Sequence, residues 1–148
     1  MTDWDSRWLA VAAVYRSFSK DPSTKVGALT VRDNRPLSQG WNGFPRGYED
    51  DPDELNDREV KYALTVHAEM NAVLNAAYNG IALEGSTLYV DGLPVCSDCA
   101  KCVVQAGIVR VVMRLNLLET PTSGRWHESF KKTAALFDEV GVEYGIRT

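Results

Sequence analysis

His67-Ala68-Glu69 and Cys96-Ser97-Asp98-Cys99 are the most informative segments of the chain, because each begins a predicted helix with side chains of a metal-binding type. The first helix is expected from His67 to Tyr78, where Ala, Met, Leu and Glu dominate. The second is shorter and is expected from Cys96 to Gln105. A strand is predicted just before it. We therefore expect two helix N-termini to converge on one point.

The remaining sequence predicts further strands and helices. Apolar residues recur at three- and four-residue spacing from Trp4 to Phe18, with Asp3 available as the N-cap, which indicates a helix. The other expected elements are strands at 26–31, 37–41, 86–90, 108–113 and 142–146, a turn at 33–36 and a helix at 126–140. A hairpin pairs antiparallel, whereas strands that alternate with helices pair in parallel. The expected fold class is α/β, a three-layer α/β/α sandwich around a mixed five-stranded sheet.

The length of 148 residues is typical of one domain, so residues 1–148 are expected to share one core and one active site. Between Asn42 and Asp57 lie two glycines, two prolines and six carboxylates. This composition disfavours regular structure and is typical of a long loop over a site. We name residues 42–57 the lid.

Composition restricts the partners and the compartment. The formal net charge is -4, so the chain lacks the basic field that attracts nucleic-acid backbones, and a small-molecule substrate is favoured. No run of eighteen apolar residues occurs and residues 1–5 are acidic, so we expect a soluble, cytoplasmic protein with no membrane segment. Cys96, Cys99 and Cys102 are too close together for a disulfide framework and indicate a metal or reactive site in a reducing compartment.

His67, Cys96 and Cys99 are the predicted ligands of a Zn²⁺ ion. A helix N-terminus favours the thiolate form that binds metals. Three protein ligands leave the fourth tetrahedral position of zinc to water, which is typical of catalytic sites, and such water readily gives hydroxide. Glu69, two residues from His67, is the predicted general base and then general acid. A carboxylate in the first turn also interacts favourably with the helix dipole, and Glu69 can have this structural role and the catalytic role together.

Two alternatives concern the other cysteine and the other histidine. Cys99 and Cys102 also form a C-x-x-C pair, but Cys102 lies further inside the predicted helix, where a buried apolar role is more typical. His127 follows Trp126 near a helix start and is left out of the site. We prefer Cys96 with Cys99.

The pattern H-x-E followed by a C-x-x-C pair is the signature of zinc-dependent nucleobase deaminases. With it, the chain resembles the cytidine and deoxycytidylate deaminase family, and most of all its dCMP deaminase branch. The resemblance covers most of the chain and rests on four segments, residues 21–28 (DPSTKVGA), 42–47 (NGFPRG), 67–72 (HAEMNA) and 96–108 (CSDCAKCVVQAGI). The family commonly has proline directly before the first cysteine, whereas here Val95 lies between Pro94 and Cys96.

The resemblance implies a hydrolase that converts dCMP to dUMP and ammonia with Zn²⁺. It also implies that Asn42 binds the deoxyribose and that the Ala68 backbone N–H contacts the base carbonyl. A homo-oligomer, a hexamer or a dimer, is implied, and in some members dCTP and dTTP act as effectors through the 43–47 loop.

Three residues in or near the lid are candidate substrate-binding residues. Arg46 and Lys61 offer cations for a monophosphate, and Tyr62 offers a ring to cover a base. Ordinary surface charge is the alternative for each, and Arg46 is also a candidate for an effector site.

Three other functions stay open. The same chemistry suits another cytosine nucleotide or nucleoside, such as dCTP, CMP or cytidine. A base in a nucleic acid is a second possibility, against which the acidic balance argues. A non-catalytic zinc-binding module is the third, against which the intact Glu69 argues.

Overall fold

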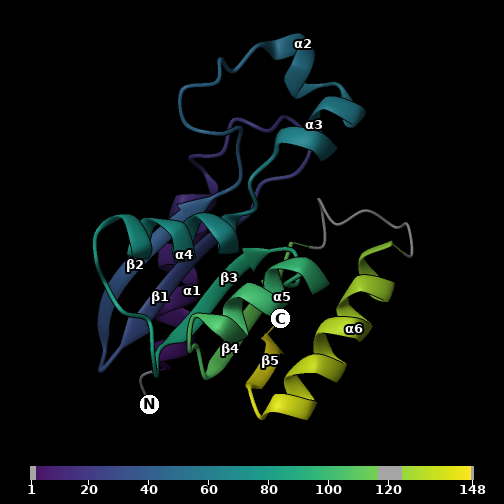
Figure 1. The fold of residues 1–148 in the computed structure, drawn as a ribbon. Coiled ribbons are helices and arrows are strands. Elements are labelled where there is room, and N and C mark those ends of the chain that lie inside the picture. The colour runs from purple at the N-terminus through teal and green to yellow at the C-terminus, as the bar shows by residue number, and fades with distance from the viewer. Residues whose placement is uncertain (1–2, 117–124, 148) are drawn as a thin grey trace.

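One mixed sheet organises the molecule, whose computed structural model describes residues 3–116 and 125–147 (Figure 1). The strand order is β2-β1-β3-β4-β5. The strands are β1 (Gly27–Arg32), β2 (Arg35–Trp41), β3 (Thr87–Gly92), β4 (Arg110–Leu115) and β5 (Glu143–Arg147). β1 pairs antiparallel with both β2 and β3, whereas β3, β4 and β5 pair in parallel. The predicted mixed five-stranded sheet is confirmed.

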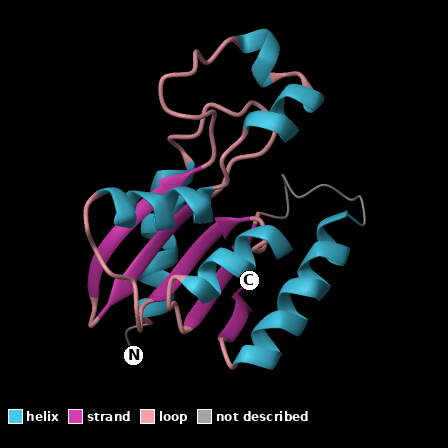
Figure 2. Cartoon of the chain, viewed as in Figure 1, coloured by secondary structure: helices cyan, strands magenta, loops and turns pink. Residues whose placement is uncertain are grey.

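Helices cover both faces of this sheet, as the ribbon and the cartoon show (Figures 1 and 2). On one face α1 (Trp4–Arg16) packs its buried Leu9 and Ala12 against β1 and β3. The other face carries three helices, α4 (Ala68–Tyr78), α5 (Ser97–Gln105) and α6 (Arg125–Val140), which enclose the larger core cluster. The predicted α/β/α sandwich is therefore confirmed, and the predicted element ends differ from the observed ones by at most two residues.

The β1–β2 turn is tighter than predicted. Only Asp33 and Asn34 form it, with φ of 53° and 58°, a left-handed pair that Asp and Asn tolerate well and that two-residue hairpins favour. The prediction of a turn over 33–36 is wrong for Arg35 and Pro36, which belong to β2. Because β2 is an edge strand, it tolerates a proline without a ladder N–H.

α4 lies unusually close to the sheet because β2 carries a glycine beneath it. A Cβ atom on Gly40 would lie 2.5 Å from both the Ala68 carbonyl oxygen and the Ala72 amide nitrogen. Backbone atoms cannot yield as a flexible side chain can, so only glycine permits this approach. The contact fixes the first turn of α4, which carries Glu69, against the hairpin.

The lid contains regular structure, so its prediction as an irregular loop is wrong in part. α2 (Pro52–Leu55) lies within it, and α3 (Arg58–Leu64) follows directly; both stand beyond the end of the sheet (Figure 1). Asp51 caps α2 and Asp57 caps α3, and each carboxylate accepts hydrogen bonds from the amides two and three residues further along the chain. Asp51 and Asp57, whose carboxylates favoured the prediction of a loop, are thus helix N-caps.

Helices that could cross a membrane are absent from residues 3–116 and 125–147, since none is both long and apolar enough.

An ion-pair network centred on the buried Asp5 joins α1 to the parallel half of the sheet. Asp5 accepts hydrogen bonds from the Tyr89 hydroxyl at 2.8 Å, from both terminal nitrogens of Arg110 at 2.8 and 2.6 Å, and from Arg147 at 2.6 Å. The hydrogen bonds from Arg110 are the main cause that lowers the pKa of Asp5 from 3.8 to about 2. Burial opposes this shift and is outweighed.

The depressed pKa of Asp5 predicts a contribution to stability that depends on pH. Because the folded pKa lies below the unfolded one, the contribution is complete above pH 3.8 and is lost as pH falls toward 2. Asp5→Asn should lower the free energy of unfolding by about 2 kcal/mol at pH 7, with a smaller difference at pH 3. Urea unfolding at both pH values measures this, with the exposed Glu139→Gln as control. A loss of equal size at both pH values would contradict it.

Candidate metal centre

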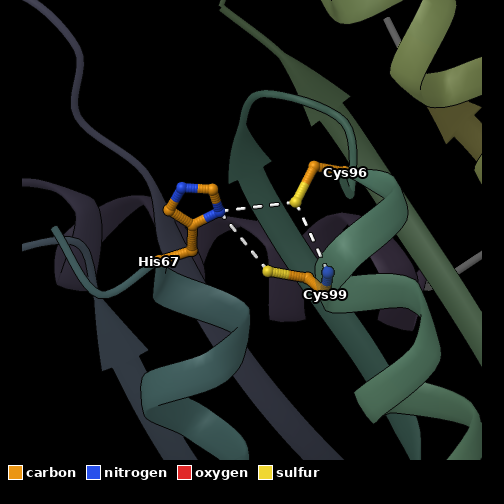
Figure 3. A group of neighbouring side chains, drawn as sticks. All are labelled: His67, Cys96 and Cys99. Carbon is orange, nitrogen blue, oxygen red and sulfur yellow. Dashed lines mark hydrogen bonds between the residues drawn. The ribbon is translucent and has the colours of Figure 1, made fainter. Parts of the chain in front are cut away.

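The N-termini of α4 and α5 meet at one end of the sheet and bring three metal-binding side chains together (Figure 3). His67 and Cys96 are the N-cap residues of these helices, with extended backbones of ψ 154° and 163°. Cys99 lies in the first turn of α5. The Nδ1 atom of His67 is 3.4 Å from each of the two sulfur atoms. Residues distant in sequence thus form one cluster.

The spacing of this cluster fits a tetrahedral zinc ion. Zinc binds sulfur at about 2.3 Å and imidazole nitrogen at about 2.0 Å, which places the two ligand atoms roughly 3.5 Å apart at a tetrahedral angle. The observed separations of 3.4 Å differ from this by only a small amount. One imidazole and two thiols are also a typical donor set for zinc. His67, Cys96 and Cys99 can therefore hold Zn²⁺ with little rearrangement.

The protonation of the three donors follows from their contacts. The hydrogen bond from the Cys99 thiol is the main cause that lowers the pKa of Cys96 to about 4, and a hydrogen bond from His67 adds to it. The hydrogen bond to Cys96 raises the pKa of His67 to about 9, although burial opposes it. The hydrogen bond to Cys96, together with burial, raises the pKa of Cys99. Metal binding must therefore release protons from His67 and Cys99, which makes metal affinity increase with pH.

Glu69 is buried beside this cluster, with 4% of its surface exposed. Burial is the main cause that raises its pKa from 4.5 to about 7, while the charge of His67 and a hydrogen bond with Cys99 oppose the rise. A carboxyl group with a pKa near neutrality exchanges a proton in either direction at small cost. The position and the pKa suit a group that carries protons.

Asn42 and Ala68 lie at the same end of the sheet as the cluster. The buried Asn42 side chain accepts a hydrogen bond from the Val26 amide at 2.9 Å and donates one to the Thr24 carbonyl at 2.8 Å. Ala68 is the first residue of α4, where a backbone N–H has no acceptor within its own helix. Asn42 therefore has a structural role that the sequence did not indicate.

Arg46, Lys61 and Tyr62 have protein partners of their own. The Arg46 guanidinium lies 4.9 Å from the ring centre of Tyr78, the last residue of α4, roughly 15 Å along the helix from its first turn. The two α3 residues bind elsewhere: Lys61 donates to Asp21 at 2.9 Å and to Ser23 at 2.8 Å, and the Tyr62 hydroxyl accepts hydrogen bonds from Arg58. The structure thus places Arg46 with the far end of α4 and not with His67.

The other histidine and cysteine lie outside the cluster. The ring of His127 stacks on that of Trp126 with 3.7 Å between the ring centres. Cys102 is half-buried on α5 and is not among the three donors that lie within 4.8 Å of one another. The arrangement favours the pair Cys96 and Cys99 over the pair Cys99 and Cys102.

A hollow of about 460 Å³ lies at the opposite end of the sheet. Its lining includes the hairpin turn, the first residue of β3 and the first residue of β4. The metal cluster follows the other end of β3, so this hollow has no part in the chemistry considered above.

Two hydroxyl residues of α6 contact the N-terminus of α5, although they were not among the predicted site residues. Ser129 accepts a hydrogen bond from the Ser97 amide, and Thr133 donates one to the Val95 carbonyl. Their signal was present in the sequence, because they lie four residues apart and Phe137 follows at the same spacing. Polar side chains on the inner face of an amphipathic helix require buried partners.

Comparison with known proteins agrees with this geometry. Residues 2–115 match the family model described as the cytidine and deoxycytidylate deaminase zinc-binding region. The chain is 38% identical over 143 residues to an uncharacterized deaminase in the luxG 3' region of Aliivibrio fischeri, with 97% of this chain and 92% of that protein covered. It is 35% identical over 150 residues to the deoxycytidylate deaminase of Homo sapiens, with 96% and 78% covered.

A solved structure shows the same arrangement of the chain. The dCMP deaminase of the cyanophage S-TIM5, in complex with dCMP and dUMP, superimposes with a TM-score of 0.76 at 25% identity over 99% of both chains. The family model covers well over half of the sequence and includes both halves of the metal cluster. The chain therefore belongs to the cytidine and deoxycytidylate deaminase family.

Proposed function

We propose that this protein is a zinc-dependent hydrolase that deaminates dCMP to dUMP and ammonia. The observation that carries the proposal is the cluster of His67, Cys96 and Cys99 beside the buried Glu69 carboxyl. Several similar proteins are named deoxycytidylate deaminases, and the similar cyanophage enzyme binds dCMP and dUMP. Both support a nucleotide substrate.

The chemistry divides between the metal ligands and Glu69. His67, Cys96 and Cys99 hold Zn²⁺, which when bound lowers the pKa of water and supplies hydroxide near neutral pH. Glu69 accepts the proton that this water loses and passes it to the ring nitrogen as the oxygen adds to C4 of the pyrimidine. Glu69 then takes the remaining proton from the hydroxyl on C4 and delivers it to the amine, so that the C4–N bond breaks, ammonia leaves and the C4 carbonyl forms. The buried position of Glu69 keeps this proton from bulk water.

The substrate contacts are part of the proposal. The two hydrogen bonds of Asn42 use one donor and one acceptor of an amide that offers two of each, so a sugar hydroxyl can still bind. The Ala68 N–H points out of the α4 N-terminus and suits the base carbonyl. Arg46, Lys61 and Tyr62 stay predictions as phosphate and base contacts, and each must leave its present partner to act.

Assembly and location are also proposals. We expect residues 1–148 to act as one deaminase domain in the cytoplasm, assembled as a homo-oligomer, a hexamer or a dimer. Three large apolar side chains of the α1 region, Trp4, Val14 and Phe18, are about half exposed, which supports burial against another chain. dCTP and dTTP are the candidate effectors, and neither a membrane nor a nucleic acid is an expected partner.

A substrate panel tests the proposed reaction. dCMP should be deaminated at least tenfold faster, as kcat/KM, than dCTP, CMP, cytidine and deoxycytidine, measured by ammonia release and by the loss of cytosine absorbance. Parallel assays with added dCTP or dTTP test the effectors. Turnover restricted to a nucleoside, or to an oligonucleotide in a salt-sensitive manner, would contradict dCMP as the substrate.

A further inference from the structure

The residue before Cys96 has both of its backbone polar groups, the amide and the carbonyl, hydrogen-bonded to other elements. Val95 is fully buried. Its amide donates to the Met113 sulfur of β4 at 3.5 Å, and its carbonyl accepts from the Thr133 hydroxyl of α6 at 2.9 Å. The backbone just before Cys96 is thus fixed by two elements that lie outside the turn itself.

The residue after Cys96 is held by the same helix. The Ser97 amide donates to the Ser129 hydroxyl oxygen at 2.9 Å, and the Ser129 hydroxyl lies 3.3 Å from that of Ser97. This amide is the first of α5, and first-turn amides have no acceptor within their helix. Ser129 of α6 therefore supplies the acceptor for the Ser97 amide, in addition to the Cys96 sulfur that accepts from the Cys99 amide.

Cys96 needs external support more than Cys99 does. Cys99 belongs to the body of α5, whereas Cys96 is the N-cap residue and lies outside the regular helix. His67 is in the same position on α4, and there the preceding Val66 is fixed by paired backbone hydrogen bonds with Gly43 at 2.8 and 3.2 Å. Each metal ligand at an N-cap position thus follows a valine whose backbone is held by hydrogen bonds. For Cys96, one of these hydrogen bonds comes from a side chain, the Thr133 hydroxyl that donates to the Val95 carbonyl.

Within residues 3–116 and 125–147, the Val95 carbonyl is the hydrogen-bond partner found for the Thr133 hydroxyl. Thr133 is fully buried, and Phe137, one turn further on the same face, is fully buried as well. A valine at position 133 would fill the same space without a polar atom. A buried hydroxyl is favoured only where it has a partner, and its partner here is the Val95 carbonyl.

We propose that Thr133 and Ser129 are positioning residues, which act through the backbone on both sides of Cys96 to hold its sulfur at the metal site. The proposal rests on the proposed zinc site, although not on the identity of the substrate. Zinc tolerates only small departures from its preferred distance to sulfur. A freed turn would therefore bind the metal more weakly even where the fold is kept.

The experiment compares Thr133→Val with Thr133→Ser, which retains the hydroxyl. Zinc-loaded proteins are mixed with a chromogenic chelator, and the rate of zinc release is recorded. Thr133→Val should release zinc about tenfold faster than wild type, and Thr133→Ser within about twofold of it. The sulfur-to-metal absorption band of the Co²⁺-substituted protein should shift in Thr133→Val alone. kcat should fall while KM stays nearly unchanged.

Ser129→Ala provides a second test at a half-buried site, where folding is less at risk. It should accelerate zinc release about threefold, whereas the exposed Lys132→Ala on α6 should leave the rate unchanged. Equal loss of thermal stability in zinc-loaded and zinc-stripped Thr133→Val, with the zinc release and cobalt spectrum of wild type, would overturn the proposal. Faster release from a protein that does not deaminate dCMP would reject the proposed substrate and retain the positioning role.

Discussion

Glu69→Gln should lower kcat for dCMP about 1000-fold, or about 4 kcal/mol of activation free energy, with one zinc ion per chain still bound. Glutamine fills nearly the same space but carries no proton between the water, the ring nitrogen and the amine. Since Glu69 is not among the three clustered donors, its substitution should leave the metal in place. Steady-state kinetics and metal analysis of the same preparation measure both quantities.

The stability of Glu69→Gln offers an independent check. In the zinc-free protein burial raises the pKa of Glu69 to about 7, so the carboxyl favours folding below pH 4.5 and that contribution is lost as pH rises through 7. Glutamine stays neutral, and the zinc-free variant should therefore unfold at a higher temperature than wild type at pH 8. The exposed Glu139→Gln is the matched control for both experiments. Activity of Glu69→Gln within tenfold of wild type would contradict the proton-carrier role.

Cys99→Ser should abolish both stoichiometric zinc and activity. One ligand of a four-coordinate zinc site contributes roughly 3 kcal/mol, so its loss should weaken binding by two orders of magnitude or more. The chain offers a close control, because Cys102 lies on the same helix one turn away and outside the cluster. Cys102→Ser should retain zinc and activity. Loss of zinc and activity in Cys102→Ser as well would assign the site to Cys99 and Cys102.

Wild type and Cys102→Ser, which both retain the metal ligands, should also show the proton linkage. His67, with its pKa raised to about 9, must lose a proton before it binds zinc, as must the Cys99 thiol. Zinc affinity of wild type and of Cys102→Ser should therefore rise steeply between pH 6 and pH 8, measured by competition with a chelator. A flat profile would contradict protonation of the zinc-free donors.

Local patterns in the sequence were sufficient to predict the layers, the sheet and the metal cluster. The helices that begin after His67 and Cys96 have strong start and stop residues, and α/β connectivity then brings their N-termini to one end of the sheet. α2 and α3 were missed because Asp51 and Asp57 read equally as loop carboxylates and as caps. A helix of one turn has too few residues for a periodic pattern.

Contacts between distant segments could not be predicted in the same way. Asp5 pairs with Arg110 across more than one hundred residues, and Arg46 lies against Tyr78. Long charged side chains reach many neighbours, so their partners depend on how elements pack and not on local sequence. Thr133 is intermediate, since its place on the inner face of α6 was readable from spacing but its acceptor was not.

The close seating of α4 over Gly40 has a mechanical consequence. It fixes the histidine ligand against the antiparallel hairpin, while both sulfur ligands lie at the N-terminus of α5, which follows strand β3 and packs against α6. An ion held by all three would bridge the seam where β1 meets β3 and the strand direction changes. Coordination would then brace two halves of the molecule against sliding past each other, in addition to serving the reaction between them.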